Sequence, residues 1–234
     1  MKVFLSADIE GISGVVHVDE IFPTGMHYQE ARRWMTMDVN AAVEGALAGG
    51  ASEVVVRDAH GYDKLSIIYD ELHPKARLIR GYRGPLTVLD GIDETFNAVF
   101  LVGYHARMGD GLGILSHTWD PRVFFDVRLD GEPVSEARIA AAQAGHFSIP
   151  VVLVTGDDVI CREVQSWLNG VQVAVVKEAL ERMGAKCLPL KDAHALIREK
   201  ARLALESIKQ VKPYTYSSSI TLEVVCINLG IAQK

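Results

Sequence analysis

Three short apolar runs, each followed at once by acidic or histidine residues, constrain the fold of this chain more than any other feature. The runs cover residues 2–7, 53–56 and 98–103, and a long stretch with apolar residues at helical spacing, His27 to Leu47, separates the first two. Short apolar runs of this kind are typical of strands in a parallel sheet, because helices cover both faces of such a strand. The sequence therefore predicts an α/β fold with a largely parallel sheet and flanking helices.

The rest of the chain continues the alternation of helices and strands. The expected helices cover 134–147, 158–168 and about 193–207, and the expected strands cover 150–154, 171–176 and 220–225. A looser stretch over 74–85 contains no clear element, and linkers are expected near 81–85 and over 211–219. We expect a catalytic, metal-binding α/β part over residues 1–150 and a smaller α/β part over 151–234.

Composition excludes several classes of partner and location. Lys plus Arg number 24 against 30 Asp plus Glu, and no basic block lies near interleaved aromatic residues, so nucleic acid is not an expected partner. The three cysteines lie far apart and form no C-x-x-C pair, which favours a reducing compartment. No run has the length of a signal peptide or of a membrane helix. We expect a cytoplasmic protein that does not bind membranes.

The polar residues at the three strand ends are of the types that bind metal ions. Asp8 and Glu10 follow the first run, Asp58 and His60 follow the second, and His105 follows the third. In open α/β sheets, ligands bind beyond the carboxyl ends of the strands, and imidazole and carboxylate groups are zinc ligands. Each residue taken singly is more often a cap, a solvated group or a structural histidine. Their joint placement favours a metal site, because converging carboxylates would repel one another without a cation.

A histidine after a glycine-rich loop is a second kind of candidate. His117 follows Gly109, Gly111 and Gly113, whose spacing matches the phosphate-binding fingerprint only loosely. An active-site loop that moves is the better interpretation of these glycines. His117 by itself is as often an ordinary loop histidine as a catalytic one. The remaining histidines lack carboxylate neighbours at matching positions and are expected to be structural or exposed.

Five segments of the chain carry a more specific pattern. They are residues 6–14 (SADIEGISG), 58–61 (DAHG), 103–106 (GYHA), 116–118 (SHT) and 130–136 (DGEPVSE). In sequence and in order they resemble the motifs of the DppA-type D-aminopeptidases. The resemblance extends from the first residue to about Ser207.

The resemblance implies a zinc-dependent peptidase that releases N-terminal D-amino acids from short peptides such as D-Ala-D-Ala. It also implies two zinc ions per subunit and a homo-oligomeric ring, which we expect to be a decamer. His117 falls on the catalytic histidine of the family. The metal-ligand positions of the family fall on Asp8, Glu10, His60, His105 and Glu136.

The chain departs from the family pattern at two places. Asp130 and Ser135 replace an asparagine and a glycine near the last ligand, and the serine is expected to shift the approach of Glu136 slightly. The residues after Val225 match nothing in the family, so a truncated or frameshifted tail that weakens assembly is expected.

Two other functions remain open from the residues alone. One is a dinuclear hydrolase of another class, a phosphoesterase or an amidase, since a metal pair is chemically generic. The other is a non-catalytic metal-binding assembly protein.

Overall fold

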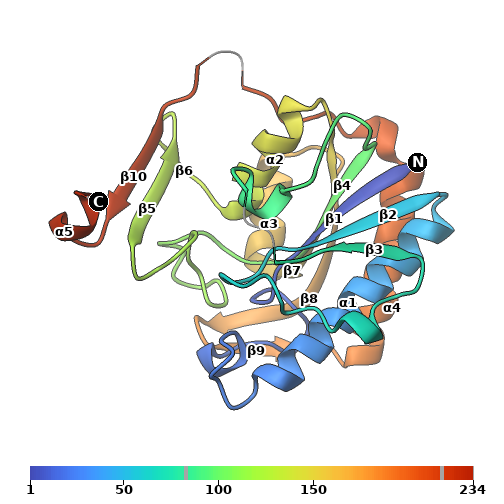
Figure 1. The fold of residues 1–234 in the computed structure, drawn as a ribbon, viewed down its shortest axis with the longest axis horizontal. Helices are drawn as coiled ribbons and strands as arrows, with labels where there is room; N and C mark the ends of the chain where they lie inside the picture. Colours follow the sequence, from blue (N-terminus) through green and yellow to red (C-terminus); the bar gives the residue numbers. More distant parts are fainter. Residues whose placement is uncertain (82–83, 217–218, 234) are drawn as a thin grey trace.

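The computed structural model describes residues 1–81, 84–216 and 219–233, so parts of both expected linkers, residues 82–83 and 217–218, lie outside the described residues. A seven-stranded sheet forms the centre of the molecule, in the order β3-β2-β1-β4-β7-β8-β9 (Figure 1). Its strands are β1 (Lys2–Ala7), β2 (Glu53–Asp58), β3 (Ala76–Ile79), β4 (Ala98–Tyr104), β7 (Val151–Asp157), β8 (Gln172–Glu181) and β9 (Gly184–Cys187).

The pairing within this sheet confirms the predicted fold class. All neighbouring strands from β3 to β8 are parallel, and only β9 pairs antiparallel to its neighbour β8. The chain moves from β1 to β2 on one side, whereas β4 lies on the other side of β1. Strand order therefore reverses at β1, and such switch points are where open α/β sheets bind ligands.

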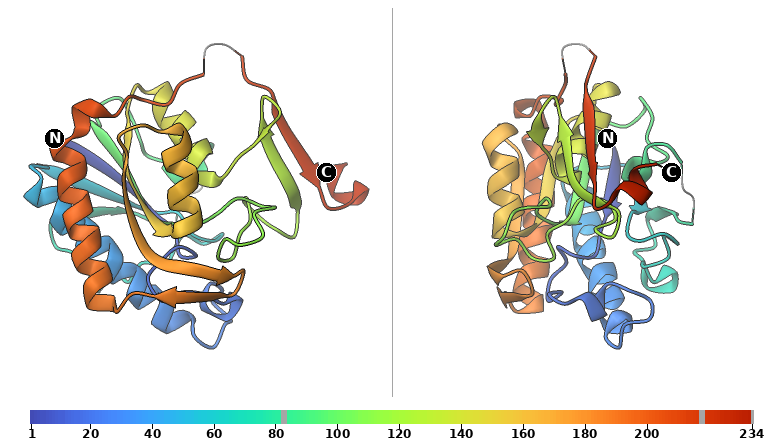
Figure 2. Two further views of the ribbon diagram at one scale, coloured as in Figure 1. Left: turned by 180° about the vertical axis from the view of Figure 1, so that it is seen from behind. Right: turned by 90° about the vertical axis from the view of Figure 1, so that its left-hand side faces the viewer.

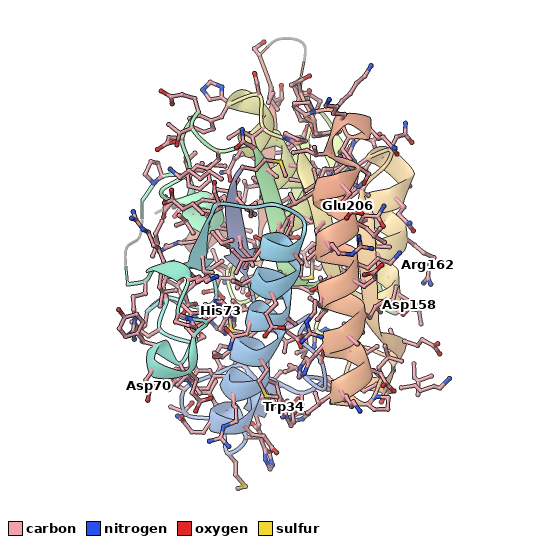
Figure 3. The ribbon with its side chains drawn as sticks, turned by 90° about the vertical axis from the view of Figure 1, so that its right-hand side faces the viewer. Trp34, Asp70, His73, Asp158, Arg162 and Glu206 are labelled. Carbon is pink, nitrogen blue, oxygen red and sulfur yellow. The ribbon has the colours of Figure 1, made fainter. Side chains whose placement is uncertain are left out.

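Helices cover both faces of the main sheet. The helices α1 (Tyr28–Ala48) and α4 (Leu190–Glu206) lie side by side on one face, as Figure 3 shows with Trp34 labelled on α1 and Glu206 on α4. The helices α2 (Glu136–His146) and α3 (Asp158–Trp167) lie on the other face (Figure 1). Short helices complete the set: η1 (Val18–Glu20), η2 (Tyr69–Glu71), η3 (Thr87–Leu89), η4 (Ile208–Gln210) and α5 (Leu229–Ala232).

The sequence pattern did not predict two strands, β3 and β9, which form the edges of the main sheet. Each has four residues, and both carry exposed or half-buried side chains because an edge strand has a partner on one side only. β3 lies within the stretch 74–85 that showed no clear element. Half-buried short strands lack the continuous apolar run that identified the central strands.

A second sheet stands to one side of the main sheet, as Figures 1 and 2 show. Its strands are β10 (Leu222–Cys226), β5 (Phe124–Leu129) and β6 (Glu132–Pro133), in that order. β5 and β6 are joined by Asp130 and Gly131, both with positive φ, as is typical of an Asp-Gly hairpin turn. A small core of its own, with Val127, Leu129 and Val134, packs against α2 through Ile139.

The main sheet contains strands from both sides of residue 150, so residues 1–150 and 151–234 share one sheet. That the part over residues 1–150 carries the metal ligands stays a prediction. Among the helices of the described residues, none has the length and apolar character needed to cross a membrane.

Candidate functional site

Three adjacent strands of the main sheet bring the candidate ligands to one edge. Asp8 directly follows β1, His60 lies two residues after β2, and His105 directly follows β4. Because β2, β1 and β4 are parallel neighbours, their carboxyl ends meet at the switch point of the sheet. The backbone pairing between β1 and β4 continues one residue past the end of β1, since Asp8 N donates to Val102 O at 2.8 Å.

Asp8 lies between two histidines and shares them with two glutamates. Asp8 Oδ1 is 3.1 Å from His60 Nδ1, and Asp8 Oδ2 is 3.5 Å from His105 Nε2. Glu10 Oε2 lies 3.3 Å from the same nitrogen of His60, and Glu136 Oε1 lies 3.6 Å from the same nitrogen of His105. Each oxygen of Asp8 thus faces a different histidine, which is the arrangement of a bridging carboxylate.

Backbone carbonyls fix the orientation of both imidazole rings. His60 Nε2 lies 2.7 Å from Ile21 O, and His105 Nδ1 lies 3.0 Å from Ala106 O. A carbonyl only accepts, so each of these nitrogens carries the proton of the neutral ring. The other nitrogen, which faces the carboxylates, then holds a lone pair. Lone pairs that face carboxylate oxygens repel them unless a proton or a metal ion lies between.

The pKa values of the histidines and of Asp8 also reflect the close approach of several carboxylates to the imidazole rings. Burial lowers the pKa of His60, but the charge of Glu10 and the hydrogen bond with Asp8 outweigh burial and raise that pKa well above its ordinary value. Burial also lowers the pKa of His105, but the carboxylates of Asp8 and Glu136 beside Nε2 outweigh burial and raise that pKa well above its ordinary value. Burial would raise the pKa of Asp8, yet the imidazoles of His105 and His60 beside its two oxygens hold it well below its ordinary value. Protons on His60 and His105 therefore lie between imidazole nitrogens and carboxylate oxygens, which are the positions that suit a metal ion.

The donor set fits a pair of metal ions. The ligand atoms form two groups, and within each group they all lie within 4.8 Å of one another. All six residues are buried: Asp8, Glu10 and His60 in one group, and His105, His117 and Glu136 in the other. Among the described residues, Glu10 Oε2 and His105 Nε2 are buried atoms without a hydrogen-bond partner. Buried polar atoms are rarely left unpaired. Imidazole and carboxylate groups of this kind are suited to zinc.

His117 lies against the second group of ligand atoms. Its ring stacks in parallel on that of His105, with 4.2 Å between the ring centroids. His117 Nδ1 donates to Leu115 O at 2.8 Å, so Nε2 of the neutral ring carries the lone pair. Nε2 lies 3.9 Å from Glu10 Oε1 and 4.0 Å from Glu136 Oε1. The structure therefore places this predicted catalytic residue among the predicted ligands.

The glycine-rich loop before His117 is fastened to the main sheet at its end. Asp157, the last residue of β7, accepts from Ile114 N through one oxygen and from Ile160 N through the other. The second bond caps α3, since Asp157 precedes the first residue of this helix. One side chain thus links the start of a helix to the segment that carries His117.

Glu136 is the first residue of α2, which begins two residues later than the helix predicted over 134–147. Ser135 caps this helix by accepting from Arg138 N, and its hydroxyl donates to Glu163 Oε1 at 2.6 Å. Trp119 N donates to Glu136 Oε1 at 2.8 Å. Ser135 therefore takes part in the cap that begins the helix at Glu136.

Asp58, which also follows a strand end in the sequence, has another partner. Its Oδ2 accepts from Ile67 N at 2.8 Å, and it belongs to neither group of ligand atoms. Burial raises its pKa. The aspartate therefore holds the loop after β2 instead of facing the other carboxylates.

Two buried lysines near the site were not identified as functional from the sequence. Lys177 of β8 donates from Nζ to the carbonyls of Glu10, Ile12 and Val15, which holds the loop after β1. Burial lowers the pKa of Lys177 to about 8. Lys64 lies in a polar loop where a lysine is ordinarily solvated, so its local sequence carries no signal of burial.

The cluster opens into a cavity of about 640 Å³, within the range of small-molecule sites. Asp8, Glu10, His60, His117 and Glu136 lie in its wall. Apolar side chains line another part, namely Ile21, Phe22, Trp119 and Phe124.

Comparisons with known proteins agree with this geometry. The family model for D-aminopeptidase matches residues 1–234. A D-aminopeptidase of Bacillus subtilis (strain 168) is 34% identical over 236 residues, which cover 100% of this chain and 84% of the relative. This chain also matches the solved structure of the Zn-dependent D-aminopeptidase DppA from Bacillus subtilis, which is described as a self-compartmentalizing protease. The TM-score is 0.93 and the sequence identity is 32%, and the match covers 97% of this chain and 82% of that chain. The chain therefore belongs to the D-aminopeptidase family.

Proposed function

We propose that this chain is a zinc-dependent aminopeptidase that removes N-terminal D-amino acids from short peptides. Two zinc ions per chain would be held by Asp8, Glu10, His60, His105 and Glu136. The observation that carries the proposal is the position of Asp8, whose two oxygens face the lone pairs of two differently oriented histidines. Family membership supports both the metal and the reaction.

The side chains of the site have separate tasks in this reaction. When bound, zinc supplies Lewis acidity, which lowers the pKa of water and polarises the scissile carbonyl. His117 holds and moves a proton at Nε2, because its Nδ1 is committed to Leu115 O. Nε2 lies 3.9 Å from Glu10 Oε1 and 4.0 Å from Glu136 Oε1, so the ring is at the edge of the ligand cluster. The ring then delivers this proton to the leaving amine.

The size of the cavity supports a short peptide as the substrate. A volume of about 640 Å³ accommodates a small ligand, and the apolar part of the wall suits small aliphatic side chains. The D configuration rests on the activity named for the Bacillus relative.

Self-association is part of the proposal. The Bacillus structure is described as a self-compartmentalizing protease, and this chain exposes apolar side chains on its second sheet, among them Phe125, Leu222 and Val225. Exposed apolar patches are typical of surfaces that bind another chain. We propose a homo-oligomeric ring, a decamer, located in the cytoplasm.

Metal analysis combined with turnover tests the function. The purified protein is expected to contain about two zinc ions and to cleave D-Ala-D-Ala faster than L-Ala-L-Ala. His60→Ala and His105→Ala should each lower the zinc content, whereas the exposed His146→Ala should not. Unchanged zinc in the first two variants would refute the ligand assignment.

Turnover also separates the competing functions. Hydrolysis of a phosphate monoester without cleavage of either dipeptide would assign the metal pair to another class of hydrolase. A zinc-loaded protein that cleaves none of these substrates would be a metal-binding assembly protein.

A further inference from the structure

Lys64 lies in the wall of the cavity although its neighbours in sequence are at the surface. Residues 61–63 and Leu65 are exposed, whereas Lys64 is 8% exposed. Lys64 lines the same cavity as Asp8 and Glu136. Lysine is almost never buried unless its charge is paired. The burial of this ammonium group therefore points to a role within the cavity.

The backbone holds Lys64 in an uncommon conformation. Its φ is +51°, a left-handed value that side chains with a Cβ rarely adopt. Gly81 N donates to Lys64 O at 3.1 Å, and Arg32 donates to the carbonyls of Leu65 and Ser66 at 3.1 and 2.9 Å. The loop is thus fastened at the strained residue and at the two residues that follow it. Strain that is held in this way is common at ligand-binding sites.

The ammonium of Lys64 has donors to spare. Within the described residues, its one hydrogen-bond acceptor is the carbonyl of Ala59, and it forms no ion pair with a carboxylate. An ammonium has three N–H donors, so two remain for a ligand. Asp8 and Glu136 attract it from a longer distance. Zinc held by these carboxylates would neutralise that attraction and leave a buried positive charge that needs an anion.

The other cations of the cavity are already engaged or exposed. Arg122 pairs with Asp120 at 2.8 Å, and its side chain is 70% exposed. Arg182 is exposed, and the guanidinium of Arg32 donates to backbone carbonyls of the loop. Among the residues that the structure describes, Lys64 is therefore the cavity cation best placed to bind an anionic group of a substrate.

We propose that Lys64 binds the C-terminal carboxylate of the peptide substrate and so selects peptides that end close to the scissile bond. The proposal rests on the aminopeptidase function proposed above. In a dipeptide or tripeptide the carboxylate lies one or two residues beyond the scissile bond, about 3–7 Å away along an extended chain. A charge-assisted hydrogen bond from the ammonium recognises that group and cannot form with a C-terminal amide.

Replacing the charge while keeping the shape tests this role. Lys64→Gln retains an N–H for the carbonyl of Ala59 but carries no charge. For D-Ala-D-Ala, we expect KM to rise by about 10- to 100-fold with little change in kcat. For the C-terminal amide of the same dipeptide, KM should stay within about twofold of the parent. Lys64→Arg should keep the preference for the free acid, and the exposed Lys75→Gln should behave as the parent.

A binding measurement makes the test independent of turnover. The probe is a dipeptide with a reduced peptide bond, prepared with a free carboxylate and as the amide, and titrated into parent and variant by calorimetry. Tighter binding of the acid in the parent, lost in Lys64→Gln, supports the proposal. If Lys64→Gln lowers the binding or cleavage of acid and amide equally, Lys64 acts on the reacting carbonyl or on the loop, and the proposal is overturned.

The same design separates failure of this proposal from failure of the function. A parent protein that cleaves neither dipeptide refutes the aminopeptidase function, while calorimetry still decides whether Lys64 binds a carboxylate. If Lys64→Gln does not fold, Lys64→Met removes the same charge with an apolar chain that suits the buried stem of the lysine.

Discussion

At the scale of the residue, ring orientation decides what each histidine can do. Nε2 of His117 faces two glutamates because Nδ1 donates to a carbonyl. Replacing His117 with alanine should lower kcat by roughly 10²–10⁴, the usual contribution of a positioned acid–base group, and change KM much less. Zinc content and melting temperature should stay at the parent values. Steady-state kinetics, elemental analysis and thermal unfolding on one preparation measure all three.

The control for this variant is His146→Ala, an exposed histidine at the end of α2, which should leave every reading unchanged. Loss of zinc from the His117 variant would make His117 a ligand, as its place in the second group of ligand atoms allows. Unchanged kcat would end its catalytic assignment.

At the scale of the element, the end of β4 approaches the end of β1 more closely than a side chain permits. Gly103 has φ +75°, and a Cβ there would lie 2.2 Å from the carbonyl oxygen of Asp8. Gly103→Ala should therefore separate the two strand ends, lower the free energy of unfolding by about 1–3 kcal/mol and weaken zinc binding. Denaturant unfolding and zinc titration measure the two effects. Gly111→Ala is the matched control, because a Cβ there meets nothing within 4 Å; equal effects of the two substitutions would contradict the prediction.

At the scale of the whole molecule, zinc should change how stability depends on pH. In the zinc-free protein, carboxylates overcome burial and raise the pKa of His60 and His105 above the ordinary 6.5. A group with a raised pKa contributes stability that is full below the unfolded pKa and is lost as the pH rises through the folded pKa. Zinc takes the place of these protons, and its binding strengthens as the ligands deprotonate.

The melting temperatures of zinc-loaded and chelated protein, compared at pH 6 and pH 8.5, check this expectation. The gap between them should widen with pH. A gap that is constant or narrows would show that these histidines do not hold the metal.

The sequence by itself determined the class of the fold and the strand ends at which the polar residues of the site lie. Continuous apolar runs identified β1, β2 and β4, because strands covered on both faces need apolar side chains throughout. The residues that follow them, Asp8, His60 and His105, were readable for the same reason. The cap at Asp157 and the turn at Asp130 were also readable, since both depend on a few adjacent residues.

Only the tertiary structure decided which of these groups meet and how. The order β2-β1-β4 places the three strand ends side by side, and no local pattern encodes strand order. Asp58 turns to a backbone amide of its own loop, and distant carbonyls set which nitrogen of His60 faces Asp8. The burial of Lys64 likewise depends on contacts that Gly81 makes with its carbonyl and that Arg32, far away in sequence, makes with the carbonyl of Leu65. Contacts between distant segments leave no mark on local periodicity, so they appear only when the chain is folded.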